Sequence, residues 1–224
     1  MNPISRIAVI GGTGKSGKYL TDQLLKQGLP FRLLLRNPAN FQLRNPLMEI
    51  VQGDARNYDS VLRLLQGCDA VLSTLGQPKD EPSIFSDATR NVLKAMHVCG
   101  IQRYIVTTGL NVDTPEDAKS PQTRFATDWM KNNYPKTTLD KQVEWELLSE
   151  SDVDWTLVRL PMIKQTDERG NVIVSLEDCP GDGISAADLA CFMIDQLSDD
   201  TYVKKAPFIA TGDDRFQDLK TADN

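Results

Sequence analysis

The fold of this chain is decided near its N-terminus, by Arg6-Ile7-Ala8-Val9-Ile10-Gly11-Gly12-Thr13-Gly14-Lys15-Ser16-Gly17. Its apolar, mostly β-branched run predicts a strand, and the pattern that follows, with leucines recurring on one face, predicts a helix. Between them the glycines are spaced G-x-x-G-x-x-G. Gly11 permits a tight turn, Gly14 leaves room for a pyrophosphate, and Gly17 lets the helix pack closely on the strand. A strand, a glycine loop and a helix in this order predict a dinucleotide site at the helix N-terminus.

Two alternatives compete with this prediction. Gly14-Lys15-Ser16 looks like the end of a P-loop, G-x-x-x-x-G-K-[ST], but the residue five before Gly14 is Val9. A P-loop needs glycine there, so the spacing excludes it. The other alternative is an ordinary turn whose glycines serve only the backbone. The context of a preceding strand and a following helix favours dinucleotide binding.

The composition excludes several classes of function. The 224 residues carry a formal net charge of −6, with 40% hydrophobic and 25% charged residues. This balance is ordinary for a globular protein and offers no basic surface for nucleic acid or an anionic membrane. Four scattered cysteines and one histidine predict no metal site. Met1-Asn2-Pro3 leads directly into the first strand, so we expect a cytoplasmic protein without a leader.

Strand and helix patterns alternate along the chain. They predict an α/β protein with a doubly wound parallel sheet, built as a single domain of residues 1–224. We expect substrate-side elements at about 161–183, a hairpin turn at 169–172 and a flexible tail at about 217–224. The predicted strands cover 7–10, 31–35, 49–55, 70–73, 100–109, 155–160, 172–176 and 208–210, and helices after the first cover 60–65, 87–98, 139–150 and 189–197.

Two polar segments interrupt this alternation. Residues 77–82 form a proline-bearing loop that is either a lid or a connector. Residues 111–136 are predicted to be a long loop holding a short helix over 123–132, and a loop of this length suggests a role in covering a substrate. In the helix that follows, we expect Val143 and Leu147 to face the sheet.

Arg36 ends the second predicted strand, 19 residues after Gly17. A dinucleotide fold places the group that faces the adenosine ribose near this position. An acidic residue there accepts from the 2′-hydroxyl of NAD, whereas an arginine fork suits the 2′-phosphate of NADP. We therefore expect NADP(H) in preference to NAD(H), with Arg32 or Arg44 as a helper. A solvated arginine is the alternative.

Polar or small residues also follow the next three strands, at the edge where open parallel sheets bind ligands. Asp54 either contacts the adenine or caps the following helix. Gly76 allows backbone to lie under a ribose. Thr107 and Thr108 add two hydroxyls to the same edge.

Together these features resemble the atypical short-chain dehydrogenase/reductases, in particular the NAD(P)H-binding subgroup with biliverdin-IXβ/flavin reductase and the NmrA-like redox sensors. The resemblance covers nearly the whole chain. Its landmarks are Gly11 to Gly17, Leu35-Arg36-Asn37, Gly53-Asp54, Leu72 to Gly76, Arg103 to Thr108, Glu150 to Pro161 and Ile184 to Ala190.

The resemblance implies a Rossmann fold that binds NADP, with the glycine loop at the pyrophosphate and Arg36 at the 2′-phosphate. It places the segment after the fourth strand at the nicotinamide ribose and the segment after Pro161 at the nicotinamide. The expected cofactor-binding residues are Gly11, Thr13, Gly14, Lys15, Ser16, Gly17, Arg36, Asp54, Ala55, Thr74, Leu75, Gly76, Thr107, Pro161, Met162 and Ile163.

The sequence departs from the family at the catalytic motif Y-x-x-x-K, whose tyrosine protonates the substrate oxygen. Four residues before Lys141 stands Thr137, and an aliphatic hydroxyl is too weak an acid for that role. The candidate catalytic residues are therefore Thr108 and Lys141. Lys141 either contacts the ribose or a substrate anion, or is a solvated lysine paired with Glu144 or Trp145.

These observations lead us to expect an NADPH-dependent oxidoreductase that transfers hydride to a conjugated, quinone- or flavin-like acceptor. Such an acceptor can take its proton without a tyrosine. The alternative is a non-catalytic NADP(H)-binding sensor or partner-binding protein, and a sugar-nucleotide epimerase is a third class. We expect a small-molecule partner and a monomer or weak homodimer.

Overall fold

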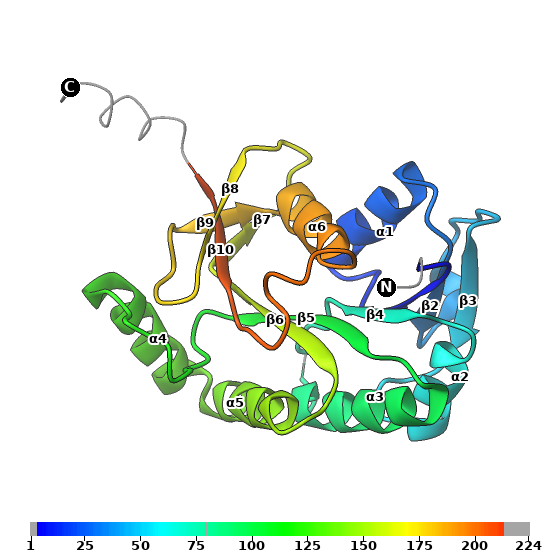
Figure 1. The fold of residues 1–224 in the computed structure, drawn as a ribbon, viewed down its shortest axis with the longest axis horizontal. Coiled ribbons are helices and arrows are strands. Elements are labelled where there is room, and N and C mark those ends of the chain that lie inside the picture. The colour runs from blue at the N-terminus through cyan, green and yellow to red at the C-terminus, as the bar shows by residue number, and fades with distance from the viewer. Residues whose placement is uncertain (1–3, 79, 213–224) are drawn as a thin grey trace.

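Most of the strands expected from apolar runs pair into one central sheet in the computed structural model, which describes residues 4–78 and 80–212 (Figure 1). The strand order is β3-β2-β1-β4-β5-β6-β10-β8, and all neighbours are parallel except β10 and β8. These strands are β1 (Ile7–Ile10), β2 (Phe31–Leu35), β3 (Met48–Gln52), β4 (Ala70–Ser73), β5 (Arg103–Gly109), β6 (Asp154–Leu160), β8 (Asn171–Ser175) and β10 (Phe208–Gly212). A second, small parallel pair joins β7 (Met162–Lys164) and β9 (Gly183–Ser185).

Helices cover both faces of this sheet (Figure 1). The helices are α1 (Gly17–Lys26), α2 (Tyr58–Leu65), α3 (Phe85–Cys99), α4 (Pro121–Asn133), α5 (Pro135–Ser149) and α6 (Ala186–Asp195). Because side chains alternate along a strand, β1 sends Val9 into the core beneath α1 and α6, and Ala8 into the core beneath α2, α3 and α5. Burial on both faces explains why the strands are continuous apolar runs. The predicted doubly wound Rossmann-type fold is confirmed.

The strand order fixes where a ligand can bind. The chain leaves β1 for β2 on one side and returns to β4 on the other, so the order reverses next to β1. In open α/β sheets the crevice at the carboxyl ends of the strands, next to this reversal, binds ligands. The glycine loop 11–17 lies there.

Within the long loop expected over 111–136, the short helix expected over 123–132 is confirmed, and it is longer than expected. Helix α4 fills Pro121–Asn133, and α5 begins directly afterwards at Pro135 instead of Leu139. Ser120 caps α4 by accepting a hydrogen bond from the Thr123 amide at 3.3 Å. The first amide of a helix has no partner within the helix, so a proline, which lacks an amide hydrogen, is well suited to that position. The prolines of this segment therefore begin helices.

Two further expectations need correction. Helix α5 buries Glu144 and Leu148, while Val143 and Leu147 are only partly buried. The turn at 169–172 is not a hairpin, because β8 pairs with β10, far along the chain. The predicted tail at 217–224 lies outside the described residues. Among the helices that are described, none is both long and apolar enough to cross a membrane.

Candidate functional site

The glycine loop packs tightly against the start of the segment after β4. Gly11 has a φ of +78°, and its carbonyl accepts from the Gly14 amide at 2.9 Å. A Cβ on Gly17 would lie 2.0 Å from that carbonyl oxygen and 2.8 Å from Thr74 Oγ1. A Cβ on Gly11 would lie 2.7 Å from the Leu75 nitrogen. Side chains at these glycines would separate the loop from β4, so the backbone needs glycine at both positions.

The tip of the same loop is open to solvent. Thr13, Gly14 and Lys15 are exposed, and Ser16 is partly exposed. Ser16 is the N-cap of α1, but its side chain makes no capping hydrogen bond. The first amides of a helix carry partial positive charge and lack partners within the helix. The loop therefore presents donors to an anion, which fits the pyrophosphate of a dinucleotide.

Thr74 and Thr107 line the neighbouring strand ends. The Thr74 amide donates to the Ile10 carbonyl at 3.0 Å, which holds the end of β4 beside the glycine loop. Its buried hydroxyl has no partner among the described residues. Thr107 Oγ1 donates to the Ser73 carbonyl at 3.4 Å, and Gly76 is exposed. The hydroxyl of Thr74 fits a ribose contact, because a buried hydroxyl normally has a partner.

Unpaired polar groups gather at the end of β5. Thr108 Oγ1 and both polar side-chain atoms of Asn111 are buried without a partner among the described residues. A Cβ on Gly109 would lie 2.2 Å from Asn111 Oδ1 and 3.5 Å from Lys141 Nζ. The absence of a side chain at Gly109 thus lets the Asn111 amide approach the strand end, and Lys141 Nζ lies within ordinary contact distance of the same point. Thr108 and Lys141, predicted to act together, lie at the same strand end.

Lys141 is not the solvated lysine that one alternative described. Its side chain is partly buried, and Nζ lies 4.8 Å from the centroid of the Phe85 ring. Burial lowers the pKa of the Lys141 ammonium, an effect that the nearby Glu144 carboxylate opposes. Burial raises the pKa of the Glu144 carboxyl to about 7. A hydrogen bond of 2.9 Å from Thr89 Oγ1 acts in the opposite direction and lowers this pKa. Lys141 and Glu144 thus lie about one turn apart on α5 and influence each other electrostatically.

The segment after β6 lies beside the end of β5. Gly109 is in register with Leu160, and the Leu110 amide donates to the Leu160 carbonyl at 3.0 Å. The three residues that follow, predicted to contact the nicotinamide, are Pro161, Met162 and Ile163. Met162 is 73% exposed although it is apolar. An exposed methionine at this edge of the sheet is available for contact with a flat apolar ring.

Arg36 lies at the opposite end of the site, where it pairs with Glu81. Arg36 Nη1 lies 2.9 Å from Glu81 Oε1, and Arg56 Nη1 lies 2.7 Å from Glu81 Oε2. These hydrogen bonds, that of Arg36 first, hold the pKa of Glu81 below its usual value. Arg32 and Arg44, the expected helpers, have other roles. Arg32 donates to carbonyls at the C-terminus of α2, and Arg44 donates to carbonyls of its own loop.

Asp54 and Ala55 follow β3 near these arginines. Asp54 Oδ1 accepts from the Arg56 amide at 2.8 Å and forms a turn. The cap of α2 is Asn57, whose Oδ1 accepts from the Ser60 amide at 2.8 Å. The capping alternative for Asp54 is therefore wrong. Ala55 is buried, and its carbonyl accepts from Asn91 Nδ2 at 2.9 Å.

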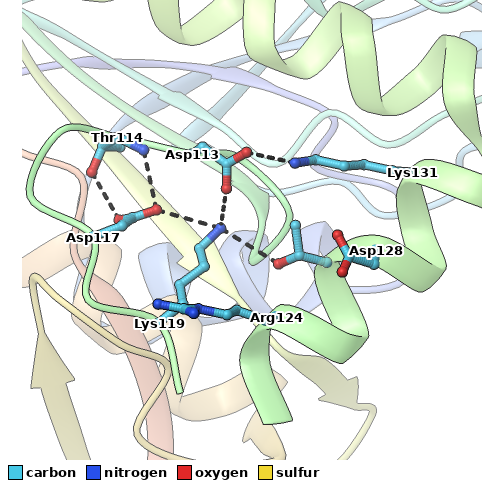
Figure 2. Close-up of a pocket in the computed structure, with 8 residues that line it drawn as sticks. Asp113, Thr114, Asp117, Lys119, Arg124, Asp128 and Lys131 are labelled. Atoms are coloured by element: carbon cyan, nitrogen blue, oxygen red, sulfur yellow. Dashed lines mark hydrogen bonds and ion pairs between the residues drawn. The ribbon is translucent and has the colours of Figure 1, made fainter. Parts of the chain in front are cut away.

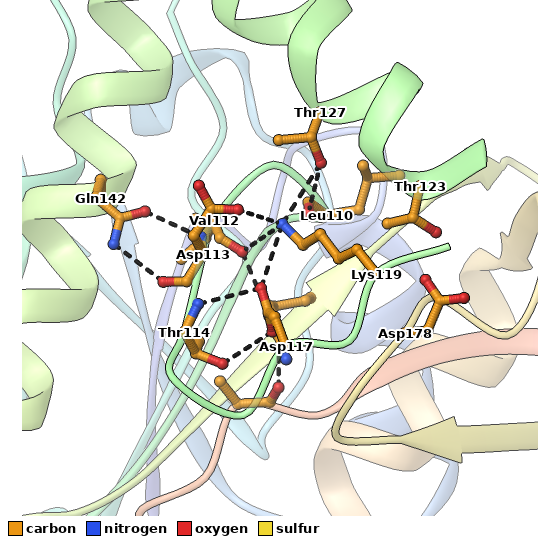
Figure 3. Close-up of polar contacts among 12 residues, drawn as sticks. Leu110, Val112, Asp113, Thr114, Asp117, Lys119, Thr123, Thr127, Gln142 and Asp178 are labelled. Atoms are coloured by element: carbon orange, nitrogen blue, oxygen red, sulfur yellow. Dashed lines mark hydrogen bonds and ion pairs between the residues drawn. The ribbon is translucent and has the colours of Figure 1, made fainter. Parts of the chain in front are cut away.

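A charged pocket of about 350 Å³ lies between α4 and the loop 110–120 that precedes it (Figure 2). Lys119 Nζ sits at its base, 2.6 Å from Asp113 Oδ1 and 3.4 Å from Asp117 Oδ2. Lys131 Nζ lies 2.7 Å from the other Asp113 oxygen. Gln142 on α5 exchanges two hydrogen bonds of 3.0 Å with the Asp113 backbone (Figure 3). These contacts fix the loop between β5 and α4 against both α4 and α5.

Sequence reasoning missed four residues of the site: Arg56, Glu81, Asn111 and Glu144. Asn111 stood two residues after a predicted strand end, so its place at the sheet edge was available as a signal. Glu144 stood three residues from Lys141 and was considered only as a solvated partner. The pairing of Arg56 with Glu81 joins segments 25 residues apart, and no local pattern indicates it.

A mostly parallel sheet with a glycine loop between β1 and α1, open at its tip, defines a dinucleotide-binding protein of the Rossmann type. The chain belongs to the NAD(P)H-binding family, whose model matches residues 11–200. NAD(P)H is thus its cofactor class, and the assignment to an NAD(P)H-binding family made from the sequence is confirmed.

Known relatives are similar in sequence to part of this chain. An isoflavone reductase homolog A622-like protein from Nicotiana tabacum is 32% identical over 133 residues, which cover 54% of this chain and 41% of that protein. The match thus spans less than half the length of this relative.

Two solved structures share the fold over most of both chains. A short-chain dehydrogenase/reductase from Veillonella parvula in complex with NADP has a TM-score of 0.76 at 15% identity and covers 93% of this chain and 95% of that chain. An anaerobillin reductase, ChuY, from Escherichia coli O157:H7 has a TM-score of 0.73 at 16% identity and covers 93% and 98%. At these identities the likeness shows the fold alone.

Proposed function

We propose that this protein is an NADPH-dependent reductase of a conjugated, quinone- or flavin-like acceptor. The observation that carries the proposal is the group of polar atoms at the end of β5: the Lys141 amine, the Thr108 hydroxyl and the Asn111 amide. They lie at the same sheet edge as the glycine loop. The reductase names among the similar proteins support a reductase as well.

The chemistry of the residues fits such an acceptor. When bound, the reduced nicotinamide supplies a hydride. Thr108 and Asn111 orient the acceptor by hydrogen bonds to its oxygen or ring nitrogen. As negative charge develops on that atom, the Lys141 ammonium stabilises it and donates its proton, and water then reprotonates the amine. Burial favours this donation, because it lowers the pKa of Lys141.

No tyrosine is needed for this reaction. Thr137 occupies the position of the family's tyrosine, and Tyr134 is 52% exposed and packs against Trp129 with ring centroids 5.8 Å apart. An isolated carbonyl becomes a strongly basic alkoxide when reduced and needs an acid close by. A quinone or flavin spreads the charge over its rings, so a lysine and water suffice.

Lys141→Met tests the proposal. Purified protein is mixed with NADPH or NADH and with quinones, flavins or biliverdin, while the absorbance of the reduced nicotinamide is followed. We expect turnover with NADPH, a fall in kcat of roughly 100-fold in Lys141→Met, and little change in the Kd of NADP⁺. Lys136→Met, an exposed lysine on the same helix, is the matched control.

Other outcomes assign the protein differently. Tight binding of NADPH without oxidation by any acceptor contradicts the reductase proposal and favours a non-catalytic sensor. Equal loss of activity in Lys136→Met contradicts the role of Lys141.

A further inference from the structure

Two arginines grip a single carboxylate at the adenosine end of the site. Arg36 follows β2 and Arg56 follows β3, which are neighbouring strands (Figure 1). Each guanidinium holds one oxygen of Glu81, at 2.9 Å and 2.7 Å, and Arg56 Nη2 also donates to the Pro82 carbonyl at 2.9 Å. We call Arg36, Arg56 and Glu81 the arginine clamp.

The arginine clamp is accessible to solvent. The side chains of Arg36, Arg56 and Glu81 are 52%, 27% and 38% exposed. Ion pairs with this exposure contribute little to stability, because water competes for both partners. A phosphate with nearly two negative charges and three acceptor oxygens binds two guanidiniums more strongly than one carboxylate does. The carboxylate of Glu81 is thus an exchangeable occupant.

The backbone holds Arg56 in place for this role. Its amide donates to Asp54 Oδ1 at 2.8 Å, and the next residue, Asn57, is the N-cap of α2. The other nearby candidates are engaged elsewhere: Arg32 with the end of α2 and Arg44 with its own loop. Glu81 belongs to the segment after β4, and the first residues of this segment, Thr74 and Leu75, pack against Gly11.

We propose that Arg36 and Arg56 together bind the 2′-phosphate of NADPH, and that the Glu81 carboxylate occupies this anion site until the phosphate displaces it. The inference rests on the proposed NADPH-dependent function and deepens it. Arg56 becomes the second residue that selects NADPH, and Glu81 an internal competitor. NADH has no 2′-phosphate and cannot displace Glu81, so Glu81 opposes only the binding of NADPH.

Calorimetric binding of two fragments tests this directly. Adenosine 2′,5′-bisphosphate and adenosine 5′-monophosphate differ only in the 2′-phosphate. For the bisphosphate we expect binding weaker by roughly 10- to 100-fold in Arg36→Gln and in Arg56→Gln. We expect binding about three- to tenfold tighter in Glu81→Gln. The monophosphate should bind all three variants as it binds the wild type.

Arg44→Gln is the matched control, because Arg44 is a nearby arginine outside the clamp. If Arg44→Gln weakens the bisphosphate and Arg56→Gln does not, the phosphate lies on the 37–44 loop and the inference is overturned. Unchanged affinity in Glu81→Gln overturns the role of Glu81. If the wild type does not prefer the bisphosphate, the preference for NADPH in the proposed function fails instead.

Discussion

Two clusters in this protein each place two cations around one carboxylate, yet they differ in access to water. In the arginine clamp, Glu81 and both arginines are between 27% and 52% exposed. In the second cluster Asp117 lies between Arg159 and Lys119, whose side chains are 0% and 6% exposed. The same set of charges therefore serves different purposes: an exposed cluster can exchange its anion for a ligand, whereas a buried one fixes the fold.

In the buried cluster, the guanidinium of Arg159 contacts several parts of the fold besides Asp117. Arg159 Nε donates to the Ala206 carbonyl at 2.7 Å, and Nη2 donates to the Leu176 carbonyl at 2.9 Å. Its guanidinium also lies 3.5 Å from the centroid of the Phe208 ring. Burial lowers the pKa of Arg159, while the hydrogen bond to Asp117 raises it. Arg159 thus ties β6, β10 and the loop before α4 together.

The largest effect is expected at this cluster. Arg159→Met should lower the free energy of unfolding by about 3–5 kcal/mol, because it removes a partner of a buried carboxylate and leaves carbonyl oxygens without donors. Urea denaturation measures the change. Arg124→Met is the control: this arginine is exposed, lines the charged pocket together with Asp117 and Lys119, and should change stability by less than about 0.5 kcal/mol. Equal stability of the two variants would remove the distinction between the clusters.

An intermediate effect is expected at the pair of Lys141 and Glu144. The Glu144 carboxyl has a pKa of about 7 in the folded protein against 4.5 as its ordinary value. Between these values the folded state keeps a proton that the unfolded state releases, so this contribution to stability is lost as pH rises from about 4.5 to about 7. Glu144→Gln should remove that slope, worth roughly 1–3 kcal/mol.

Melting temperatures at several pH values within this window measure the slope. Glu146→Gln, an exposed glutamate on the same helix, should keep the slope of the wild type. A slope that survives in Glu144→Gln would show that Glu144 titrates normally.

The smallest effect is expected in the arginine clamp. Arg36→Gln, Arg56→Gln and Glu81→Gln should each change the free energy of unfolding by less than about 1 kcal/mol, because exposed ion pairs stabilise little. The same urea experiment applies, in the absence of nucleotide. A loss of several kcal/mol in any of them would mean that the clamp supports the fold, and would end the contrast with Arg159.

The parts predicted from the sequence are those with local causes. The β-branched run before Gly11 and the spacing of the glycines specify a strand, a turn and a helix within a dozen residues. Counting along the chain was enough to place Arg36 at the end of β2. Thr108 was placed at the edge of the sheet because it follows a clear apolar run.

The parts that were missed depend on distant contacts or on context. Arg56 acquires its role only when the segment after β4 brings Glu81 to it. Glutamate is usually a surface residue, and the sequence pattern cannot show that Thr89 on another helix donates a hydrogen bond to Glu144 in the core. Ser120-Pro121 is a recognisable helix start, but the helix was expected to begin only at residue 123, because prolines in a polar run were interpreted as loop.

Asp140 and Lys141 are consecutive residues of α5 with separate duties. The Asp140 carboxylate accepts from Ser83 Oγ and from the Phe85 amide at 2.8 Å, which ties down the end of the segment that carries Glu81. Lys141 instead reaches the strand end at Gly109. Adding or removing one residue of α5 ahead of this pair would rotate both residues by about 100° around the helix axis and move them by about 1.5 Å along it. The length of α5 ahead of Asp140 therefore sets the positions of both side chains. An insertion or deletion there would misplace both of them, whereas a substitution would not.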